Sequence, residues 1–242
     1  MRILVFSDIH ANLAALDAVL SDAGQTDAAW FLGDLVGYGP DPNECIQRIQ
    51  ELDALVCLQG NHDAAAIGSL SLDSFNPEAR RSIEWLRDNL TDDSRAFLSE
   101  LSPHAEMGDV TLVHASPRQP VLEYLLDVYS AGQNFDFFDG PYCFVGHTHI
   151  PVHFAQDANG GSTRMRIPKP NSQITLERRC IVNPGSVGQP RDRDPRAAFA
   201  IFDSEAHTWD YRRVDYDVES VQEKMRSANL PERHVVRLAG GW

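Results

Sequence analysis

Short apolar runs that end in polar residues recur through the first half of the chain. Residues 3–6, 29–32 and 54–58 each form such a run, and runs of this length with β-branched and aromatic side chains are typical of buried strands. Between them, residues 12–20 and 42–52 repeat apolar side chains at helical spacing, which predicts helices. The repeated order of strand, loop and helix predicts an α/β fold.

The pattern then shifts toward paired strands. Asn76 followed by Pro77 is a favourable start for a helix that runs to residue 89, and residues 104–114 predict a hairpin about Gly108. Residues 116–140 carry many aromatic side chains and no clear strand, which predicts a helical excursion over a functional site. The remaining expected elements are strands at 142–145, 150–156, 163–167, 173–176, 179–182, 197–203 and 207–215, a helix over 218–227 and a loose tail.

No internal repeat, low-complexity segment or linker divides the chain, which predicts a single domain over residues 1–242. Strand–helix units dominate the first half and hairpins the second. This order predicts two packed sheets, the first mostly parallel, with helices outside them.

Acidic residues outnumber basic ones, and this narrows the range of partners. With 35 Asp and Glu against 21 Lys and Arg, the formal charge is −14, which disfavours an extended nucleic-acid surface. Cysteines 45, 57, 143 and 180 show no CxxC spacing. Because Cys57, Cys143 and Cys180 lie inside apolar stretches, we expect buried free thiols rather than disulfides or metal ligands. The chain opens on a predicted strand rather than a leader, and no apolar run reaches the roughly 20 residues of a membrane span. We therefore expect a cytoplasmic protein.

Polar side chains capable of binding metal follow the predicted strands. Because ligands bind at the carboxyl ends of strands in open α/β sheets, residues at these ends are candidates for one site. A single histidine of this kind is more often structural, but scattered core histidines would not cluster in this way. The candidates are Asp8, His10, Asp34, Asn61, His62, His114, His147 and His149.

These side chains offer oxygen and imidazole donors without thiolates. That chemistry does not fit a closed structural zinc site; it fits Mn, Fe, Co, Ni or catalytic Zn with positions left for water. One carboxylate can also bridge two cations, and such pairs are suited to phosphoryl chemistry.

Five short segments of the sequence resemble, in order, the motif blocks of the calcineurin-like metallophosphoesterases. They are Asp8-Ile-His10, Gly33-Asp34, Gly60-Asn61-His62-Asp63, His114 and Gly146-His147-Thr-His149. The segment from Asn183 to Gly188 also resembles the small bacterial branch that includes YfcE-type phosphodiesterases and relatives described as diadenosine tetraphosphatases. The resemblance implies a four-layer α/β/β/α sandwich of two mixed β-sheets flanked by helices.

The resemblance also implies roles for these residues. One divalent ion would be held by Asp8, His10, Asp34 and His149, and a second by Asp34, Asn61, His114 and His147. Manganese is the expected metal, with Fe, Zn, Ni or Co as alternatives. His62 would be the catalytic histidine that binds no metal, and a hydroxide shared by the two metals would attack the phosphorus atom.

The implied activity is metal-dependent hydrolysis of phosphate esters, of the phosphodiester type. The alternatives are a dinucleoside polyphosphate (Ap4A-type) hydrolase, a phosphomonoesterase, or a Vps29-like metal-binding scaffold without activity. The scaffold is disfavoured because His62 and all of the implied ligands are present. The expected partner is a small phosphate ester or nucleotide, no membrane is expected, and a homodimer is left open.

The sequence departs from the family in the loop after Asp34. Many family phosphatases carry there an acidic residue that orients the catalytic histidine and an arginine that grips phosphate; this chain has Gly37 and Tyr38. Monoesterase activity of the protein-phosphatase type is therefore disfavoured. Asp63 could orient His62, although neighbouring side chains in a loop need not meet.

Several further residues are weaker candidates for contact with substrate. They are Arg118, Tyr38 and Arg191, with Arg193 as an alternative to Arg191, and for each arginine a solvated surface position is the competing interpretation. The aromatic residues of the excursion could form a wall for a nucleobase, although packing against the domain is the simpler explanation. These aromatic residues are Tyr124, Tyr129, Phe135, Phe137 and Phe138.

Overall fold

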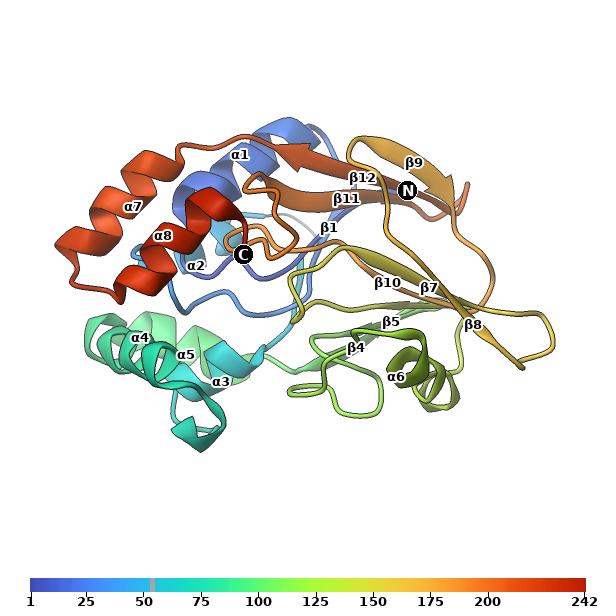
Figure 1. Ribbon diagram of the computed structural model, residues 1–242, viewed down its shortest axis with the longest axis horizontal. Helices are drawn as coiled ribbons and strands as arrows, with labels where there is room; N and C mark the ends of the chain where they lie inside the picture. The colour runs from blue at the N-terminus through green and yellow to red at the C-terminus, as the bar shows by residue number, and fades with distance from the viewer. Residues whose placement is uncertain (53–54) are drawn as a thin grey trace.

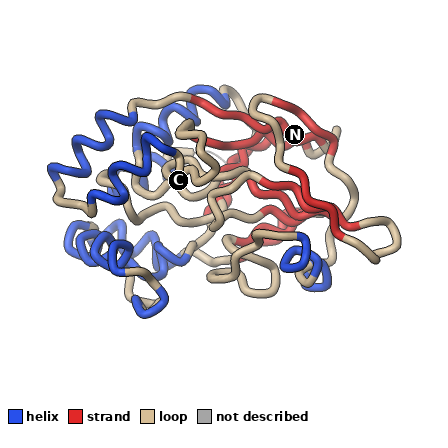
Figure 2. Tube along the Cα trace, viewed as in Figure 1, coloured by secondary structure: helices blue, strands red, loops and turns tan. Residues whose placement is uncertain are grey.

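The computed structural model describes residues 1–52 and 55–242, so residue 54 of the predicted third strand lies outside the described residues. Two sheets pack face to face with helices outside them, and most helices gather toward one end of the sheets (Figures 1 and 2). This arrangement confirms the expected sandwich of two mixed sheets flanked by helices. No helix of the described residues has the length and apolar character needed to cross a bilayer.

The first sheet has six strands in the order β3-β2-β1-β11-β12-β9. Its strands are Leu55–Cys57, Ala28–Phe31, Arg2–Phe6, Ala197–Asp203, Thr208–Val214 and Ser172–Thr175, in that order. β1, β2 and β3 are parallel, whereas β11, β12 and β9 join the sheet through antiparallel pairings. The expectation of a mostly parallel first sheet is therefore wrong, because the last hairpin of the chain pairs with β1 instead of extending the second sheet.

The second sheet has the order β4-β5-β6-β10-β7-β8. Its strands are His104–Met107, Val110–Val113, Tyr142–Phe144, Cys180–Asn183, Val152–Gln156 and Thr163–Arg166. The predicted hairpin of β4 and β5 forms with Met107 paired to Val110. β5, β6 and β10 run parallel to one another, so their carboxyl ends lie at one edge of the sheet.

Polar side chains begin several of the helices, and the predicted cap at Asn76 is among them. Asn12 caps α1 (Leu13–Ala23), Asn76 caps α4 (Pro77–Asn89) and Asp217 caps α7 (Val218–Ser227) by accepting a backbone N–H of the first turn. α2 (Pro42–Gln50) begins at the expected proline.

Three helices were not predicted: α3 (Asn61–Ala66), α5 (Asp92–Glu100) and α8 (Glu232–Gly240). The expectation of a loose tail is wrong, because Val235 and Leu238 of α8 are buried and Gly241 ends the helix in the left-handed conformation.

The segment 116–140 is mostly loop, with the short helix α6 (Val128–Gly132) and a 3₁₀ turn at Phe135–Phe137. α6 contacts β7 and β8, so it covers the outer face of the second sheet instead of lying over the strand ends. The loop before α6 does reach the strand ends, where Leu122 and Tyr124 border the site described below.

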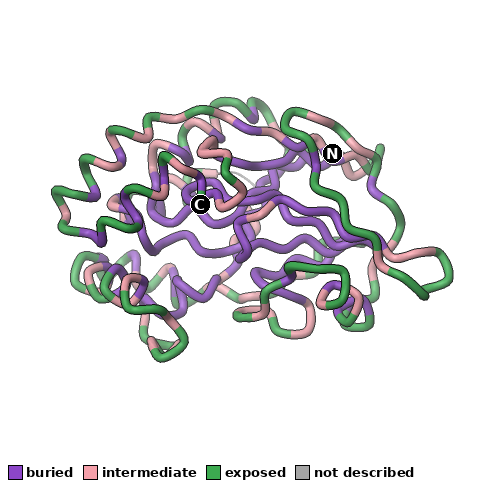
Figure 3. Tube along the Cα trace, viewed as in Figure 1, coloured by how far each residue is buried: buried purple, intermediate pink, exposed green. Residues whose placement is uncertain are grey.

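The apolar core has a layer between the two sheets and a layer beneath each set of helices (Figure 3). Trp30, Phe144 and Trp209 pack between the sheets, whereas Leu16 of α1 and Ile46 of α2 pack on the outer face of the first sheet. Because both faces of the central strands are covered, their ends are held rigidly and can position polar side chains.

Candidate metal centre

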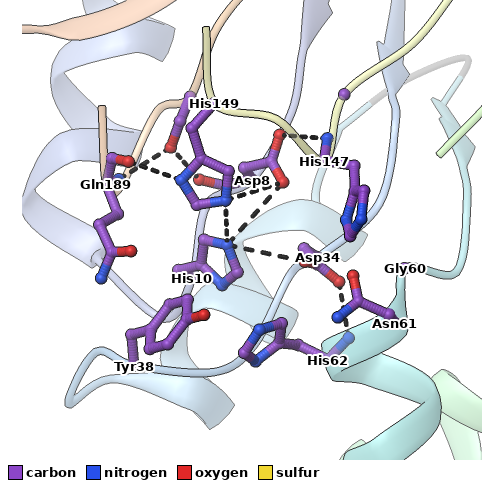
Figure 4. Close-up of polar contacts among 12 residues, drawn as sticks. Asp8, His10, Asp34, Tyr38, Gly60, Asn61, His62, His147, His149 and Gln189 are labelled. Carbon is purple, nitrogen blue, oxygen red and sulfur yellow. Dashed lines mark hydrogen bonds and ion pairs between the residues drawn. The ribbon is translucent and has the colours of Figure 1, made fainter. Parts of the chain in front are cut away.

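The loops at the carboxyl ends of the strands converge and bury their polar side chains together (Figure 4). Asp8 and His10 follow β1, Asp34 follows β2, and His114 follows β5. The remaining candidates follow β3 and β6, namely Asn61 and His62 in the first turn of α3, and His147 and His149 in the loop after β6. The structure thus brings together all eight residues that the sequence singled out.

Five of these residues have a left-handed backbone. The φ angles of Asp8, His10, Asp34, His147 and His149 lie between 48° and 64°. This conformation costs roughly 1–2 kcal/mol for a residue with a side chain. At these positions the chain turns sharply just after a strand, and the turns direct the polar side chains into the same site.

The loop around Asn183 and Ser186 holds two of these turns in position. The Asn183 side-chain amide donates to the carbonyl oxygen of Gly146 at 2.6 Å and to the hydroxyl of Thr148 at 3.1 Å. The Ser186 hydroxyl donates to the carbonyl oxygen of Asp8 at 2.8 Å. The segment that resembles the bacterial branch therefore braces the turns that carry Asp8 and His147.

The first ligand group consists of Asp8, His10, Asp34 and His149. His149 Nε2 lies 3.4 Å from Asp8 Oδ1, and His10 Nε2 lies 3.6 Å from Asp34 Oδ2. These separations are long for direct hydrogen bonds and suit coordinating atoms arranged around one cation.

The histidine tautomers indicate what this group binds. His10 Nδ1 lies 3.1 Å from the carbonyl oxygen of Val36, and His149 Nδ1 lies 2.6 Å from that of Gln189. A carbonyl can only accept, so each Nδ1 donates its proton and leaves a lone pair on Nε2. The two Nε2 atoms nevertheless face each other at 3.0 Å. Two lone pairs at this distance repel unless a cation lies between them, so the site fits a metal ion.

The second ligand group consists of Asp34, His114 and His147. His114 Nδ1 donates to the carbonyl oxygen of Leu32 at 2.8 Å, so its Nε2 lone pair faces Asp34 Oδ2 at 3.5 Å and Asn61 Oδ1 at 3.1 Å. His147 Nε2 is buried without a partner. The side-chain atoms that converge here carry lone pairs and no hydrogen to share, which suits a cation. Asp34 belongs to both ligand groups.

Burial controls the charges of the two ligand groups. Desolvation raises the pKa of Asp8 to about 7 and raises that of Asp34 well above its usual value. Desolvation also lowers the pKa of His10, His147 and His149 well below the usual range. The imidazoles are therefore neutral, the form that binds metal, and the carboxylates require a cation to stabilise their charge.

His62 lies beside the ligand groups and belongs to neither of them. Its ring is 4.9 Å from that of His10 and 4.4 Å from that of Tyr38, measured between centroids. Its Nδ1 is buried without a hydrogen-bond partner, and burial lowers its pKa well below the usual value. The neutral ring thus has a free polar atom beside the metal centre.

Asp63 does not orient the His62 ring. Its carboxylate accepts backbone N–H groups from Asp34 and Gly60 at 2.9 Å each and from Val36 at 3.0 Å. Because three amides occupy this carboxylate, its function is to join the turn after β2 to the start of α3.

Gly37 explains why no acidic residue orients His62 from the preceding loop. Its φ is +105°, and a Cβ atom there would lie 2.5 Å from His62 Nδ1. The histidine ring therefore occupies the space that a side chain at position 37 would need.

The weaker substrate candidates have different surroundings. Tyr38 is buried, and Arg191 Nη2 lies 3.4 Å from its hydroxyl, so both residues border the metal centre. Arg118 pairs with Glu123 and donates to Gln133 Oε1 at 2.9 Å. Arg193 is exposed. Of the three arginines considered, Arg191 therefore lies beside the metal centre. Arg118 instead contacts residues of its own segment.

A pocket of about 220 Å³ opens beside His62 and His147. The Tyr124 ring lies over the His147 ring with 4.0 Å between centroids. The Phe75 and His62 rings meet edge to face with 5.1 Å between centroids. Of the predicted aromatic wall, Tyr124 alone lines this pocket. Phe135 and Phe138 are buried in the core of the second sheet, whereas Tyr129 and Phe137 are exposed.

Sequence reasoning missed four residues near the centre: Phe75, Gln189, His234 and Arg237. Phe75 precedes a predicted helix and had no signal of its own. His234 and Arg237 lie on α8, whose apolar residues Val235 and Leu238 at helical spacing could have identified the helix.

Comparisons with known proteins agree with this geometry. The model of the calcineurin-like phosphoesterase superfamily domain matches residues 1–207. The crystal structure of a metallophosphoesterase from Sphaerobacter thermophilus is 47% identical, with a TM-score of 0.92, and the match covers 100% of this chain and 99% of that chain.

Two curated relatives are also similar over most of their length. An uncharacterized protein of Methanocaldococcus jannaschii is 36% identical over 237 residues, covering 95% of this chain and 94% of that protein. The symmetrical bis(5′-nucleosyl)-tetraphosphatase of Proteus mirabilis is 33% identical over 198 residues, covering 73% of this chain and 71% of that enzyme. The resemblance drawn from the motif segments is confirmed, and the chain belongs to the calcineurin-like phosphoesterase superfamily, as a metal-dependent hydrolase of phosphate esters.

Proposed function

We propose that this chain is a phosphodiesterase that uses two divalent cations. The observation that carries the proposal is the position of Asp34, whose carboxylate belongs to both ligand groups. A shared carboxylate can bridge two cations, and cations roughly 3.5–4 Å apart suit in-line displacement at phosphorus. The ligands would be Asp8, His10, Asp34 and His149 for one ion and Asp34, Asn61, His114 and His147 for the other. Manganese is our first choice of metal, followed by Fe, Zn, Ni or Co.

When bound, the cations would supply Lewis acidity, which lowers the pKa of a water molecule and stabilises charge on the phosphoryl oxygens. His62 has one N–H in its neutral form and lies beside both ligand groups without joining them. We assign it as the donor to the departing oxygen, a role worth on the order of 10²–10⁴ in rate.

Two features support a diester as the substrate. Tyr38 stands where many relatives carry a phosphate-gripping arginine, and its ring lies against His10 and His62. The pocket between Phe75 and Tyr124 could accept an aromatic or nucleoside leaving group on the far side of the phosphorus atom.

A dinucleoside polyphosphate hydrolase is the second candidate. The tetraphosphatase of Proteus mirabilis is similar over 73% of this chain, and Arg191 places an extra positive charge beside the ligand groups. We also propose a reducing compartment such as the cytoplasm, since the four cysteines are free thiols.

A metal-reconstitution screen tests the proposal. Chelator-treated protein would be loaded with Mn, Fe, Zn, Ni or Co and assayed on bis-p-nitrophenyl phosphate, p-nitrophenyl phosphate, cyclic nucleotides and diadenosine tetraphosphate. We expect activity with Mn, a preference for diester over monoester, and about two metal ions per chain. One ion per chain in the active protein would contradict the dinuclear centre.

Asp34→Asn provides the matched test of the shared carboxylate. We expect this variant to lose both metal ions and activity together, because both ligand groups lose a charged donor. Asp22→Asn is the control, since Asp22 is exposed and lies 3.7 Å from Arg212 at the surface.

A further inference from the structure

Among the arginines of the described residues, Arg191 and Arg237 are those with a buried side-chain nitrogen that has no hydrogen-bond partner. Neighbouring arginines pair with carboxylates: Arg213 with Asp192, Arg196 with Asp194 and Arg233 with Glu78. Within residues 1–52 and 55–242, neither Arg191 nor Arg237 forms an ion pair, although the chain has 35 acidic residues against 21 basic ones.

The two guanidinium groups converge on one neutral acceptor. Arg191 Nη2 donates to Gln189 Oε1 at 2.9 Å, and Arg237 Nη1 donates to the same oxygen at 3.3 Å. Gln189 is 1% exposed, and its Nε2 has no partner. The Nε atoms of both arginines are also buried without partners. The two positively charged guanidinium groups thus share one amide oxygen, and both keep N–H groups without an acceptor near Gln189.

Gln189, the residue that both guanidinium groups contact, lies on the side of the metal centre away from Asn61 (Figure 4). Figure 4 shows Gln189 and Tyr38 next to His10 and His149, with Asn61 on the other side of Asp34. The Arg191 guanidinium lies 5.8 Å from the Tyr38 ring centroid, and that ring lies 4.6 Å from the His10 ring. The Arg237 guanidinium lies over the Trp242 ring, 5.5 Å from its centroid.

Arg237 comes from α8, outside the residues that the superfamily model matches. α8 packs against α7, and its buried face of His234, Val235 and Leu238 fixes the direction of Arg237. The helix that the sequence pattern did not predict therefore adds a positive charge to the strand-end site.

We propose that Arg191 and Arg237 form an anion subsite that binds a second phosphoryl group, next to the one that is hydrolysed. The chemical class of ligand is a pyrophosphoryl or polyphosphate chain. Planar guanidinium groups bind phosphate oxygens in pairs, and these two have unused donors beside Gln189 and Tyr38. The inference rests on the proposed function and narrows it toward substrates with adjacent phosphoryl groups.

Binding of inorganic pyrophosphate to chelator-treated protein tests the subsite without turnover. Calorimetric titration would compare pyrophosphate with orthophosphate for wild type, Arg191→Gln, Arg237→Gln and Arg237→Lys. We expect wild type to bind pyrophosphate at least tenfold more tightly than orthophosphate. Either Gln variant should lose about tenfold in pyrophosphate affinity, and Arg237→Lys should lose less.

Arg233→Gln is the matched control, because Arg233 lies on the same helix, is exposed and faces Glu78 at 3.7 Å. Equal pyrophosphate affinity in wild type and Arg237→Gln, or an equal loss in Arg233→Gln, would overturn the subsite. Thermal unfolding of each variant identifies any that fails to fold, and Arg237→Lys then provides the comparison.

A kinetic arm separates this inference from the proposed function. With Mn-loaded protein, Arg237→Gln should lower kcat/KM for diadenosine tetraphosphate at least fivefold more than for bis-p-nitrophenyl phosphate. Equal losses on the two substrates would contradict the subsite and leave the phosphodiesterase standing. Arginine-dependent pyrophosphate binding by a wild type inactive on every ester would support the subsite and reject the proposed function.

Discussion

At the scale of single residues, the metal centre depends on backbone carbonyl oxygens that fix the histidine rings. The carbonyls of Leu32, Val36 and Gln189 accept Nδ1 protons, so the lone pairs of His114, His10 and His149 point inward. Each carbonyl belongs to a strand end or a loop of the same site. The tautomers are therefore set before any ligand arrives, which reduces the cost of binding one.

His62→Ala should separate catalysis from metal binding. We expect kcat to fall by about 10²–10⁴ with an unchanged metal content, because His62 belongs to neither ligand group. The measurements are steady-state kinetics on the best diester and metal analysis of the purified variant. An unchanged kcat would contradict the assigned role, and His104→Ala, which changes an exposed histidine paired with Glu106, is the control.

Gly37→Ala should damage both stability and activity. The new Cβ atom would lie 2.5 Å from His62 Nδ1, and the φ of +105° strains any residue with a side chain. We expect a loss of roughly 1–3 kcal/mol in the free energy of unfolding and at least a tenfold loss of kcat.

The control for Gly37→Ala is Gly68→Ala. Gly68 has a similar φ of +82°, but nothing lies within 4 Å of a Cβ atom built there. Chemical denaturation of both variants therefore separates backbone strain from the collision with His62. Equal losses of stability and of activity in the two variants would show that the His62 ring moves freely away.

At the scale of elements, α8 adds buried groups beside the site. His234 is 2% exposed, both of its ring nitrogens lack partners, and its ring lies 4.6 Å from that of Tyr38. The charged groups that act on it are Arg237, Arg191 and Glu78. α8 therefore packs against Tyr38 at the metal centre through a histidine that burial keeps neutral.

His234→Phe should reduce the acid sensitivity of the fold. Burial lowers the pKa of His234 to about 4, below the unfolded value of 6.5. The unfolded chain then binds a proton that the folded chain refuses, so stability is lost as the pH falls from 6.5 toward 4. At pH 5 the difference corresponds to about 2 kcal/mol.

Urea denaturation at pH 7.5 and pH 5 measures this effect. The loss of stability between the two pH values should be smaller in His234→Phe than in wild type, whatever the change at pH 7.5 alone. The exposed substitution His104→Phe should leave the wild-type difference in place. An identical pH dependence in wild type and His234→Phe would contradict a buried neutral histidine.

At the scale of the whole molecule, the loops of the two sheets enclose the carboxylates of Asp8 and Asp34 together with three neutral imidazoles. A bound cation would stabilise the negative charge of these two carboxylates. Cation binding to the folded chain alone stabilises it by mass action, by about 2.7 kcal/mol for one site at a hundredfold excess over its dissociation constant. For a domain of this size, that corresponds to an increase in Tm of roughly 5–10 °C.

Manganese should therefore raise the Tm of chelator-treated protein by roughly this amount, and renewed chelation should reverse the change. Differential scanning calorimetry of wild type and Asp34→Asn is the measurement. Asp34→Asn should show little or no increase, because both ligand groups contain this carboxylate. An increase as large as that of wild type would place the stabilising ion elsewhere.

Much of the fold follows from local pattern. The strand at 197–203 and the helix at 218–227 have the predicted bounds, because apolar periodicity is a local signal. The parallel character of the first sheet was predicted wrongly, since the partner of β11 depends on contacts with residues almost two hundred positions away. α8 was missed because Gly240 and Gly241 suggested a loose end, whereas Gly241 is the residue that ends the helix.

The sequence by itself determined the set of polar side chains that stand at the strand ends, because the end of a buried apolar run is a local property of the chain. Only the tertiary structure decided how they meet: Asp34 is shared by two ligand groups, Arg118 turns to Glu123, and Arg237 reaches Gln189. These outcomes depend on the packing of loops and of α8 against distant strands. Side-chain contacts across such separations are set by the free energy of the whole folded chain, which no local pattern contains.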